Sequence, residues 1–183
     1  MLNYYTYYFV LTFLLAAIFT FATIKIATKL KILDYPGEDR KIHQKTIPLL
    51  GGVAIFLSFF IVLFLTKDKL VSGNLNYHHW VGFFIGAIFL MLGGFLDDKY
   101  NIDPKKQIIW PILAILSIIA GGVGIEKITN PFDGIFFLNQ LKITLWHIQG
   151  KAYYFIFLTD IFTFLWLMGM MYTTKLLDGV DGL

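Results

Sequence analysis

Apolar and polar positions follow one another along this chain in long blocks. Five apolar blocks are long enough, or nearly long enough, to form helices that cross a bilayer, whose hydrocarbon core takes about 20 helical residues. They lie near residues 7–27, 49–65, 80–96, 108–125 and 155–173. The second, third and fourth blocks are somewhat short, so we expect flanking residues to extend these helices or the bilayer to be thinner around them. The pattern predicts an all-α, polytopic membrane protein: one membrane domain over residues 1–183 with about five transmembrane helices.

The composition favours a membrane protein and argues against other classes. Hydrophobic residues make up 57% and charged residues 15% of the 183 positions, and the mean hydropathy is +0.70, whereas soluble domains carry more charge. With a net charge of +3 and one Arg among 15 basic residues, no nucleic-acid-binding patch is expected. The absence of cysteine excludes disulfides. No Lys or Arg precedes Lys25, and the first block exceeds a signal-peptide core, so we expect a retained span.

Basic residues are distributed unevenly among the loops, and this predicts the orientation. Loop 28–48 contains five Lys or Arg residues, and the next loop contains two. Because short loops rich in these residues stay in the cytoplasm, we expect loops 28–48, 97–107 and 174–183 to be cytoplasmic and the N-terminus to lie outside. Segment 126–152 would lie outside. Its apolar run 135–138 is too short to span, so we expect this run on the membrane surface or against helix ends.

The second cytoplasmic loop begins with two adjacent acids, Asp97 and Asp98, at the end of an apolar block. Two carboxylates at a helix end repel each other and lose solvation unless a cation or another partner is near. They are about 100° apart around a helix, so one can face a cavity while the other faces a partner or a metal ion. A solvated acid pair is the alternative, and the Gly-Gly pair before it and the Lys-Lys pair after it weaken that interpretation.

The third cytoplasmic segment contains Asp178 and Asp181, each followed by Gly. A spacing of three places both on one face if the segment is helical, which suits binding of one cation or one nucleotide. A Gly-rich turn is the alternative. Together with Asp97 and Asp98, these acids would gather at one membrane face, where a divalent cation could bring two phosphate-bearing substrates together.

The first cytoplasmic loop carries a cationic cluster, Arg40, Lys41 and His43, beside acids. Such a cluster is suited to holding phosphate oxygens, and an ordinary positive-inside loop is the alternative. Gly51 and Gly52 open the second apolar block. We expect close backbone packing at these glycines, either around a site or for helix packing alone.

Taken in order, the three segments resemble the polyprenyl-phosphate N-acetylhexosamine-1-phosphate transferases, the MraY/WecA/TagO family, or glycosyltransferase family 4. The first is similar to the D-x-P...R-K-x-H...P-x-x-G-G loop of the WecA/TagO type at Asp34, Pro36, Arg40, Lys41, His43, Pro48, Gly51 and Gly52. The second matches G-x-x-D-D at Gly94, Asp97 and Asp98. The third matches D-G-x-D-G-L at Asp178, Gly179, Asp181, Gly182 and Leu183. Three matches in this order are much more specific than one.

The resemblance implies a reaction and its partners. In this family the phosphate of a polyprenyl phosphate, undecaprenyl phosphate in bacteria, attacks the β-phosphate of a UDP-N-acetylamino sugar such as UDP-GlcNAc, and UMP leaves. The lipid-linked product initiates cell-envelope polysaccharide synthesis. Phosphoryl transfer needs alignment and charge neutralisation, so carboxylates, basic residues and Mg²⁺, with Mn²⁺ as an alternative, are consistent with it. We expect a multi-pass protein of a bacterial-type plasma membrane with a cytoplasmic active face; a homodimer is compatible with the resemblance.

The same resemblance assigns roles to residues. Asp97 is expected to engage or deprotonate the lipid phosphate, and Asp98 to support it or to bind metal. Asp178 and Asp181 are expected to hold the nucleotide sugar or its Mg²⁺, which makes Asp98 and Asp181 the expected metal ligands. The remaining expected substrate-binding residues are Arg40, Lys41 and His43.

Some features depart from the family pattern. Lys175 and Tyr172 stand where Asn is usual, and Gln107 lies near, but out of register with, the Gln expected after the acid pair. The resemblance covers nearly all of this chain but only the N-terminal half of a roughly ten-span fold, so we expect a fragment or a truncated product. The alternatives are a non-catalytic membrane fragment or subunit and, with less support, a transporter.

One acid lies within an apolar block. Asp160 is about five residues inside the last block, where an ionisable side chain is costly and suggests a functional role. Its nearness to the outer end of the block favours an interfacial acid instead.

Overall fold

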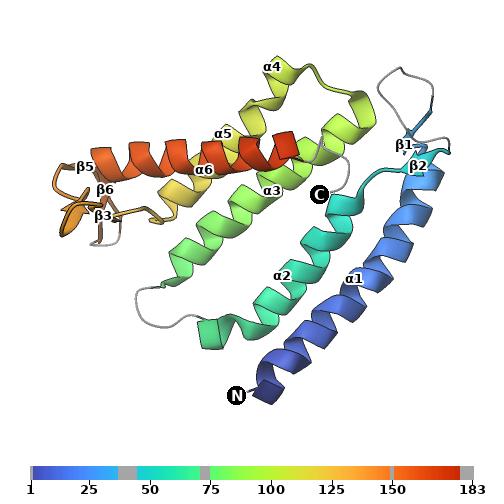
Figure 1. The fold of residues 1–183 in the computed structure, drawn as a ribbon, viewed down its shortest axis with the longest axis horizontal. Coiled ribbons are helices and arrows are strands. Elements are labelled where there is room, and N and C mark those ends of the chain that lie inside the picture. The colour runs from blue at the N-terminus through green and yellow to red at the C-terminus, as the bar shows by residue number, and fades with distance from the viewer. Residues whose placement is uncertain (1, 37–44, 71–74, 149–150, 178–183) are drawn as a thin grey trace. The chain divides into compact units, whose positions relative to one another are not determined.

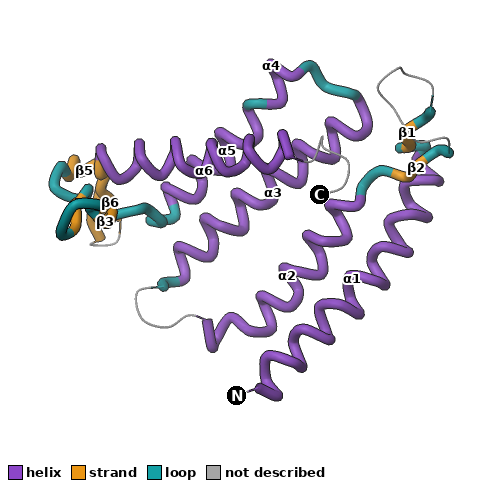
Figure 2. Tube along the Cα trace, in the orientation of Figure 1, coloured by secondary structure: helices purple, strands orange, loops and turns teal. Residues whose placement is uncertain are grey.

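The computed structural model describes residues 2–36, 45–70, 75–148 and 151–177, and helices predominate among them (Figures 1 and 2). The helices are α1 (Leu2–Leu30), α2 (Gly51–Leu70), α3 (Tyr77–Tyr100), α4 (Pro104–Gln107), α5 (Ile109–Ala120) and α6 (Phe157–Leu177). The strands are β1 (Leu33–Asp34), β2 (Ile47–Pro48), β3 (Lys127–Thr129), β4 (Ile135–Phe137), β5 (Lys142–Ile148) and β6 (Lys151–Ile156). A helix lies within each predicted apolar block, so the expectation of a mainly helical chain is confirmed.

Among the described residues, two helical segments are long and apolar enough to cross a membrane, judged by length and composition. They are Tyr5–Leu30 in α1 and Tyr77–Tyr100, the whole of α3; the apolar part of α2, Gly51–Lys67, is shorter. Along α1, large apolar side chains face outward, with Phe9 73% and Phe21 71% exposed. Apolar surface of this extent is unfavourable in water and suits a lipid environment. The number of membrane crossings stays a prediction.

The helix in the fourth apolar block is shorter than the block. α5 has 12 residues and ends at Ala120, so it rises about 18 Å, less than a bilayer core of about 30 Å. The helix ends there because Gly122 adopts a φ of 85°, while its amide donates to Ile119 O at 2.8 Å and the Val123 amide donates to Ile118 O at 3.2 Å. These are the paired hydrogen bonds of a Schellman helix end. The predicted block continues to residue 125 because hydropathy does not register the hydrogen bonds that end the helix at Ala120.

In the part of the chain that the structure describes, three antiparallel two-stranded hairpins, β1–β2, β3–β4 and β5–β6, depart from the predicted all-α pattern. The β3–β4 hairpin and most of β5–β6 lie in segment 126–152, predicted to be outside the membrane, and β6 continues to Ile156. Strands β5 and β6 are rich in β-branched and aromatic residues, which favour extended backbone. The run 135–138 contains β4, whose three side chains are exposed, and Leu138, which is half-buried. Its placement on the membrane surface or against helix ends stays a prediction.

The chain folds as two compact units. The first unit comprises Met1–Asn76 and Ala87–Trp110, and the second comprises Tyr77–Gly86 and Pro111–Leu183. The acid pair at 97–98 therefore belongs to the first unit, whereas the two outer hairpins belong to the second.

In the first unit, α1 and α2 lie side by side, and a buried cluster of Ala27, Ile32 and Leu50 closes the end where α1 leads toward α2 (Figure 1). α1 ends there because Lys31 adopts a φ of 57° and the Ile32 amide donates to Ala27 O at 2.9 Å. The Leu49 amide donates to Ile32 O at 3.2 Å, which holds the chain entering α2 against the end of α1. This junction sets the position of the N-terminus of α2.

In the second unit, the first part of α3 approaches α5 through glycines. A Cβ at Gly82 would lie 2.6 Å from Ser117 O, and a Cβ at Gly86 would lie 2.8 Å from Ala114 O. A side chain at either position would collide with the backbone of α5. The two glycines therefore allow the backbones of α3 and α5 to come close.

Candidate functional site

Asp97 lies in the last turn of α3, and the following turn folds back onto its carboxylate. Asp97 Oδ1 accepts hydrogen bonds from the Ile102 amide at 3.1 Å and from Gln107 Nε2 at 2.6 Å. Gln107 Nε2 also donates to Ile102 O at 2.7 Å. These bonds fix the orientation of the Asp97 carboxylate, because its Oδ1 is held by donors from two positions of the loop.

The sequence between the acid pair and Gln107 explains why this side chain can reach back. Asn101 adopts a φ of 48°, which turns the chain after α3. Asp103 then caps the short helix α4, accepting a hydrogen bond from the Lys105 amide at 2.8 Å, and Pro104 occupies the first helical position. α4 makes one helical turn and ends at Gln107 beside Asp97.

Asp98 points to a different partner. Its Oδ2 accepts a hydrogen bond from the Leu50 amide at 3.1 Å, across 48 positions of the sequence. Leu50 immediately precedes α2, where backbone amides lack helical partners and the helix dipole is positive. Asp98 therefore caps α2 and ties the end of α3 to the end of the first cytoplasmic loop.

The two carboxylates diverge as their positions around the helix predict. One oxygen of each, Asp97 Oδ2 and Asp98 Oδ1, accepts no hydrogen bond within the part of the chain that the structure describes. Asp97 is half-buried and Asp98 is exposed, so a ligand can reach this pair. Carboxylate oxygens are hard ligands of the kind Mg²⁺ prefers, and Mg²⁺ commonly takes one or two carboxylates with phosphates and water.

The acid pair alone is not a complete metal-binding cluster. Among the described residues, no group of three or more His, Asp or Glu side chains could hold a metal ion. The donor set of Asp97 and Asp98 thus fits a part of a Mg²⁺ coordination sphere. Further ligands would come from the substrate, from water or from residues outside the described ranges.

Glycines beside the acids differ in their surroundings. A Cβ at Gly51, Gly52 or Gly94 would meet no described atom within 4 Å, whereas a Cβ at Gly93 would lie 2.4 Å from Trp110 Cγ. The expectation of close backbone packing at Gly51 and Gly52 is therefore wrong for the described residues. Of the glycines beside the acids, Gly93 is the one that packs closely, against the Trp110 side chain. The space around Gly51, Gly52 and Gly94 leaves backbone accessible near the acid pair.

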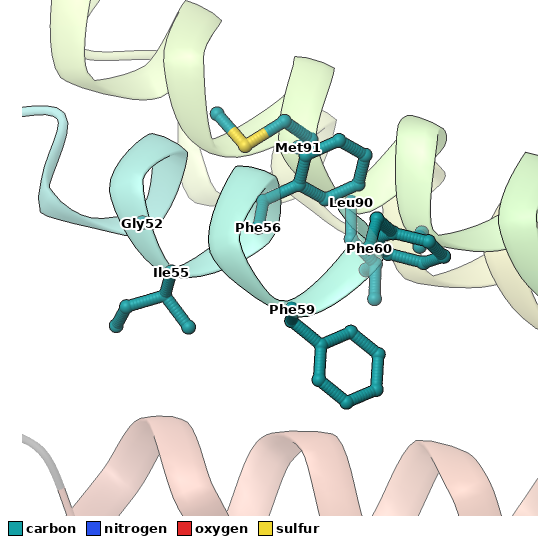
Figure 3. A pocket seen from close by; sticks show the side chains of 8 residues that line it. Gly52, Ile55, Phe56, Phe59, Phe60, Leu90 and Met91 are labelled. Carbon is teal, nitrogen blue, oxygen red and sulfur yellow. The ribbon is translucent and has the colours of Figure 1, made fainter. Parts of the chain in front are cut away.

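An apolar cavity of about 350 Å³ lies between α2 and α3 in the first unit (Figure 3). Phe56 and Phe60 of α2 lie toward Leu90 and Met91 of α3 in this view. The cavity begins at Gly52, two residues after the amide that binds Asp98. The complete lining is Gly52, Ile55, Phe56, Phe59, Phe60, Ala87, Leu90 and Met91.

Several predicted site residues lie outside the described residues. These are Arg40, Lys41, His43, Asp178 and Asp181. Their convergence on the acid pair stays a prediction. The flanks of the first-loop motif are described: Asp34 pairs with Ile47, and Leu33 pairs with Pro48, in the β1–β2 hairpin. This hairpin brings the two ends of the motif together.

Sequence reasoning missed two partners of the acid pair. Gln107 was noted only as out of register with the resembling family, yet it contacts Asp97 directly. The Asp-Pro pair at 103–104 was an available signal, since it predicts a helix start that places Gln107 one turn later. No local signal identifies Leu50, because its amide meets Asp98 only through the tertiary fold.

Asp160 has a structural role in the second unit. Its Oδ2 accepts a hydrogen bond from the Ile156 amide at 2.8 Å, immediately before α6. An acid in the first turn of a helix that satisfies a free amide stabilises the helix start. The expectation that Asp160 is an interfacial acid stays a prediction.

Comparison with known proteins identifies similar sequences. A family model described as glycosyl transferase family 4 matches residues 80–183, which include both Asp-containing segments at 97–98 and 178–181. No solved structure matches this chain significantly.

Three curated relatives illustrate the similarity. "Probable undecaprenyl-phosphate N-acetylglucosaminyl 1-phosphate transferase" of Bacillus subtilis (strain 168) is 27% identical over 176 residues, 96% of this chain and 42% of that protein. "Undecaprenyl-phosphate alpha-N-acetylglucosaminyl 1-phosphate transferase" of Haemophilus influenzae is 33% identical over 127 residues, 67% of this chain and 33% of that protein. "Phospho-N-acetylmuramoyl-pentapeptide-transferase" of Listeria innocua is 28% identical over 180 residues, 96% of this chain and 52% of that protein. The chain thus spans about half the length of these relatives or less.

Proposed function

Because this chain belongs to glycosyl transferase family 4, we propose that it serves in the transfer of an N-acetylamino sugar 1-phosphate, GlcNAc-1-phosphate in the first instance, from a UDP-sugar to polyprenyl phosphate. The names of the relatives in Bacillus subtilis and Haemophilus influenzae support undecaprenyl phosphate as the acceptor and GlcNAc-1-phosphate as the group transferred. The observation that carries the proposal is the acid pair fixed at the end of an apolar helix, next to open backbone and an apolar cavity.

The reaction has a simple balance of bonds. An oxygen of the lipid phosphate forms a bond to the β-phosphorus of the UDP-sugar, and the bond from that phosphorus to the oxygen bridging the α-phosphorus breaks. UMP leaves with the bridging oxygen, and the lipid keeps the sugar on a diphosphate. The protein has mainly to align the two phosphates and to offset their charge.

The described residues supply part of this alignment. Donors from Ile102 and Gln107 hold Asp97 Oδ1, which supports Oδ2 as the oxygen that accepts a proton or a hydrogen bond from the lipid phosphate. The cap made by Asp98 fixes the start of α2. The first two residues of this helix, Gly51 and Gly52, leave space for phosphate oxygens. Arg40, Lys41 and His43 are proposed to bind phosphates, and Asp178 to bind the nucleotide sugar.

A divalent cation, Mg²⁺ or alternatively Mn²⁺, would supply charge neutralisation on the diphosphate. The residues proposed to hold it are Asp98, through the oxygen that no described residue contacts, and Asp181. Its removal by a chelator is expected to stop transfer and to be reversed by Mg²⁺.

We propose that the chain crosses a bacterial-type plasma membrane about five times with its N-terminus outside. Loops 28–48, 97–107 and 174–183 would then share the cytoplasmic face with the acids. The apolar helices and the distribution of Lys and Arg support this arrangement. Phosphate transfer to a lipid requires such a site at a membrane boundary.

The test is a UMP-release assay with UDP-GlcNAc, polyprenyl phosphate and Mg²⁺. It uses membranes carrying this chain and membranes carrying a chimera in which this chain replaces the matching segment of the Bacillus subtilis relative. We expect Asp97→Asn in the active form to reduce release by about 100-fold or more, as for loss of a group acting in the transition state, and Asp133→Asn, at an exposed acid of the second unit that belongs to none of the matched motifs, to leave it unchanged. Release from neither membrane, or unchanged release with Asp97→Asn, would contradict the proposal and favour a non-catalytic membrane subunit.

A further inference from the structure

Exposed apolar side chains lie on the β3–β4 hairpin in the second unit. We name them the hairpin surface, and they are Phe132, Ile135, Phe136 and Phe137. Their side chains are between 47% and 94% exposed, with Phe132 the most exposed. Several large apolar side chains exposed on one short hairpin usually mark a contact site.

Both faces of the hairpin carry apolar side chains. Phe136 of β4 pairs with Ile128, whereas Phe137 pairs with Lys127 one position along. Because successive side chains of a strand point to opposite faces, Phe136 lies on one face and Ile135 and Phe137 lie on the other. A hairpin in water would normally turn one polar face outward. Here neither face of β4 is polar.

The turn of the hairpin presents a phenylalanine at its tip. The Phe132 amide donates to Asn130 Oδ1 at 3.1 Å, and the Asn130 amide donates to Gly134 O at 3.1 Å. Gly134 completes the turn with a φ of 80°. These bonds hold the turn, so Phe132, which is 94% exposed, projects as a consequence of the backbone geometry.

The base of the hairpin is attached to the start of α6, near which the outer hairpins lie in Figure 1. The Leu138 amide donates to Glu126 O at 2.8 Å and closes the hairpin. The neighbouring Ile125 amide donates to Thr163 Oγ1 of α6 at 2.9 Å. A Cβ at Gly124 would lie 2.6 Å from Thr159 Cγ2, so the chain packs tightly against α6. The hairpin is therefore held at the end of an apolar helix.

We propose that the hairpin surface docks on the lipid headgroup–acyl boundary at the membrane face where α6 begins. This proposal rests on α6 crossing the membrane as proposed above. Large apolar side chains next to Lys are typical of segments that lie in this boundary. Lys127 Nζ lies 5.6 Å from the ring centroid of Phe137, and Lys142 begins β5. Each lysine can pair with a lipid phosphate, while the acids of the same hairpin, Glu126 at its base and Asp133 at its turn, have to stay among the hydrated headgroups.

The depth of docking is limited by the backbone. A two-stranded hairpin has free edges, whose amide and carbonyl groups need water or another partner. Leaving them in hydrocarbon costs several kcal/mol for each group. The hairpin surface thus lies at the boundary, with its apolar side chains below the headgroups and its strand edges still hydrated.

The experiment uses site-directed spin labelling of the whole 183-residue chain, which has no cysteine. Single cysteines replace Phe132 and Ile135 in the hairpin surface, Leu165 in the middle of α6, and Lys105 in α4. Each labelled variant is placed in vesicles of phosphatidylethanolamine and phosphatidylglycerol. Collision rates are then measured with oxygen, which concentrates in lipid, and with a water-soluble nickel chelate.

We expect Leu165→Cys to report lipid and Lys105→Cys to report water. Phe132→Cys and Ile135→Cys are expected to collide with oxygen more often than Lys105→Cys and with nickel several-fold less often. Two hairpin positions are used so that a local disturbance at one does not decide the result. Adding Phe132→Asp to Ile135→Cys is expected to restore nickel collisions.

The possible results separate the two proposals. If Phe132→Cys collides with nickel as often as Lys105→Cys does, while Leu165→Cys reports lipid, docking of the hairpin surface is overturned. The proposed membrane crossing of α6 would stand in that case. Low collision rates with both reagents would show that protein covers the hairpin surface, which also overturns docking. If the label at Leu165→Cys collides with nickel as often as the label at Lys105→Cys, α6 does not cross the membrane. That result would overturn the topology on which the proposal rests.

Discussion

At the scale of single residues, the two adjacent acids have different environments. Asp97 is held by the turn that follows it, and Asp98 is held by the start of a helix distant in sequence. The helical offset of about 100° between neighbours is sufficient to predict that they diverge. It is not sufficient to predict their partners, because these depend on where α2 and α4 lie.

Gln107 is expected to act as a positioning residue for Asp97. Replacing it with Leu removes the donor at 2.6 Å while keeping a side chain of similar size. Loss of such a supporting hydrogen bond is expected to lower kcat for sugar-phosphate transfer by about 10- to 100-fold, with a smaller change in KM for UDP-GlcNAc. Steady-state kinetics of UMP release would check this. The matched control is Gln140→Leu, at an exposed Gln outside the site; equal activity of both variants would contradict the role of Gln107.

Two neighbouring glycines are expected to respond in opposite ways to the same substitution. Gly93→Ala would place Cβ 2.4 Å from Trp110 Cγ, so the start of α5 has to move. Such overpacking costs about 1–3 kcal/mol. Gly94→Ala meets open space, and Ala in a helix is favoured by about 0.5–1 kcal/mol. Thermal unfolding in detergent would compare them, and a Gly93→Ala variant as stable as Gly94→Ala would refute the packing role.

At the scale of elements, the ends of helices determine the site. The cap from Asp98 joins α3 to α2, and the Schellman ends of α1 and α5 stop these helices at Leu30 and Ala120. We expect Asp98→Ala to release the Leu50 amide and to accelerate hydrogen exchange at the start of α2, since loss of a helix cap costs about 0.5–2 kcal/mol. Asp103→Ala removes a different cap and is the control. Equal exchange at Leu50 in both variants would contradict the cap.

A second tertiary hydrogen bond fixes the hairpins to α6. Thr163 Oγ1 accepts from the Ile125 amide, so Thr163→Val leaves that amide without its partner. The expected cost is about 1–3 kcal/mol, measured as a lower unfolding temperature in detergent. Thr173 is an exposed threonine of the same helix, and its Oγ1 donates to Gly169 O within that helix. Thr173→Val is therefore the matched control. A loss of stability that is no larger than in this control would argue against the attachment.

Hydropathy predicted where helices lie but not where all of them end. Each apolar block contains a helix, because length and apolar content suffice to predict it. α5 stops early at Gly122, and the strands at 127–156 were missed, because both follow from hydrogen bonds and local backbone preferences that hydropathy does not measure. The divergence of the two carboxylates at 97–98 was predictable from their neighbouring positions on a helix. The contact between Asp98 and Leu50 was not, because it joins residues 48 positions apart.

At the scale of the whole molecule, the proposed reaction constrains which side of the membrane each loop occupies. A lipid phosphate and a water-soluble UDP-sugar can meet only at one boundary, so the proposed transfer requires the segments that carry acids to share it. The distribution of Lys and Arg predicts that they do. The same distribution predicts that the hairpin surface lies on the opposite face.

The most direct test of this central claim is the labelling of single cysteines in intact cells with a membrane-impermeant maleimide, before and after permeabilisation. The chain has no native cysteine, and the three positions are Lys105→Cys after the acid pair, Lys175→Cys before the last motif, and Asn76→Cys in the predicted outer loop before α3. We predict that Lys105→Cys and Lys175→Cys react only after permeabilisation, whereas Asn76→Cys reacts before it. Reaction of Lys105→Cys and Lys175→Cys from opposite sides would contradict a shared site for the acids.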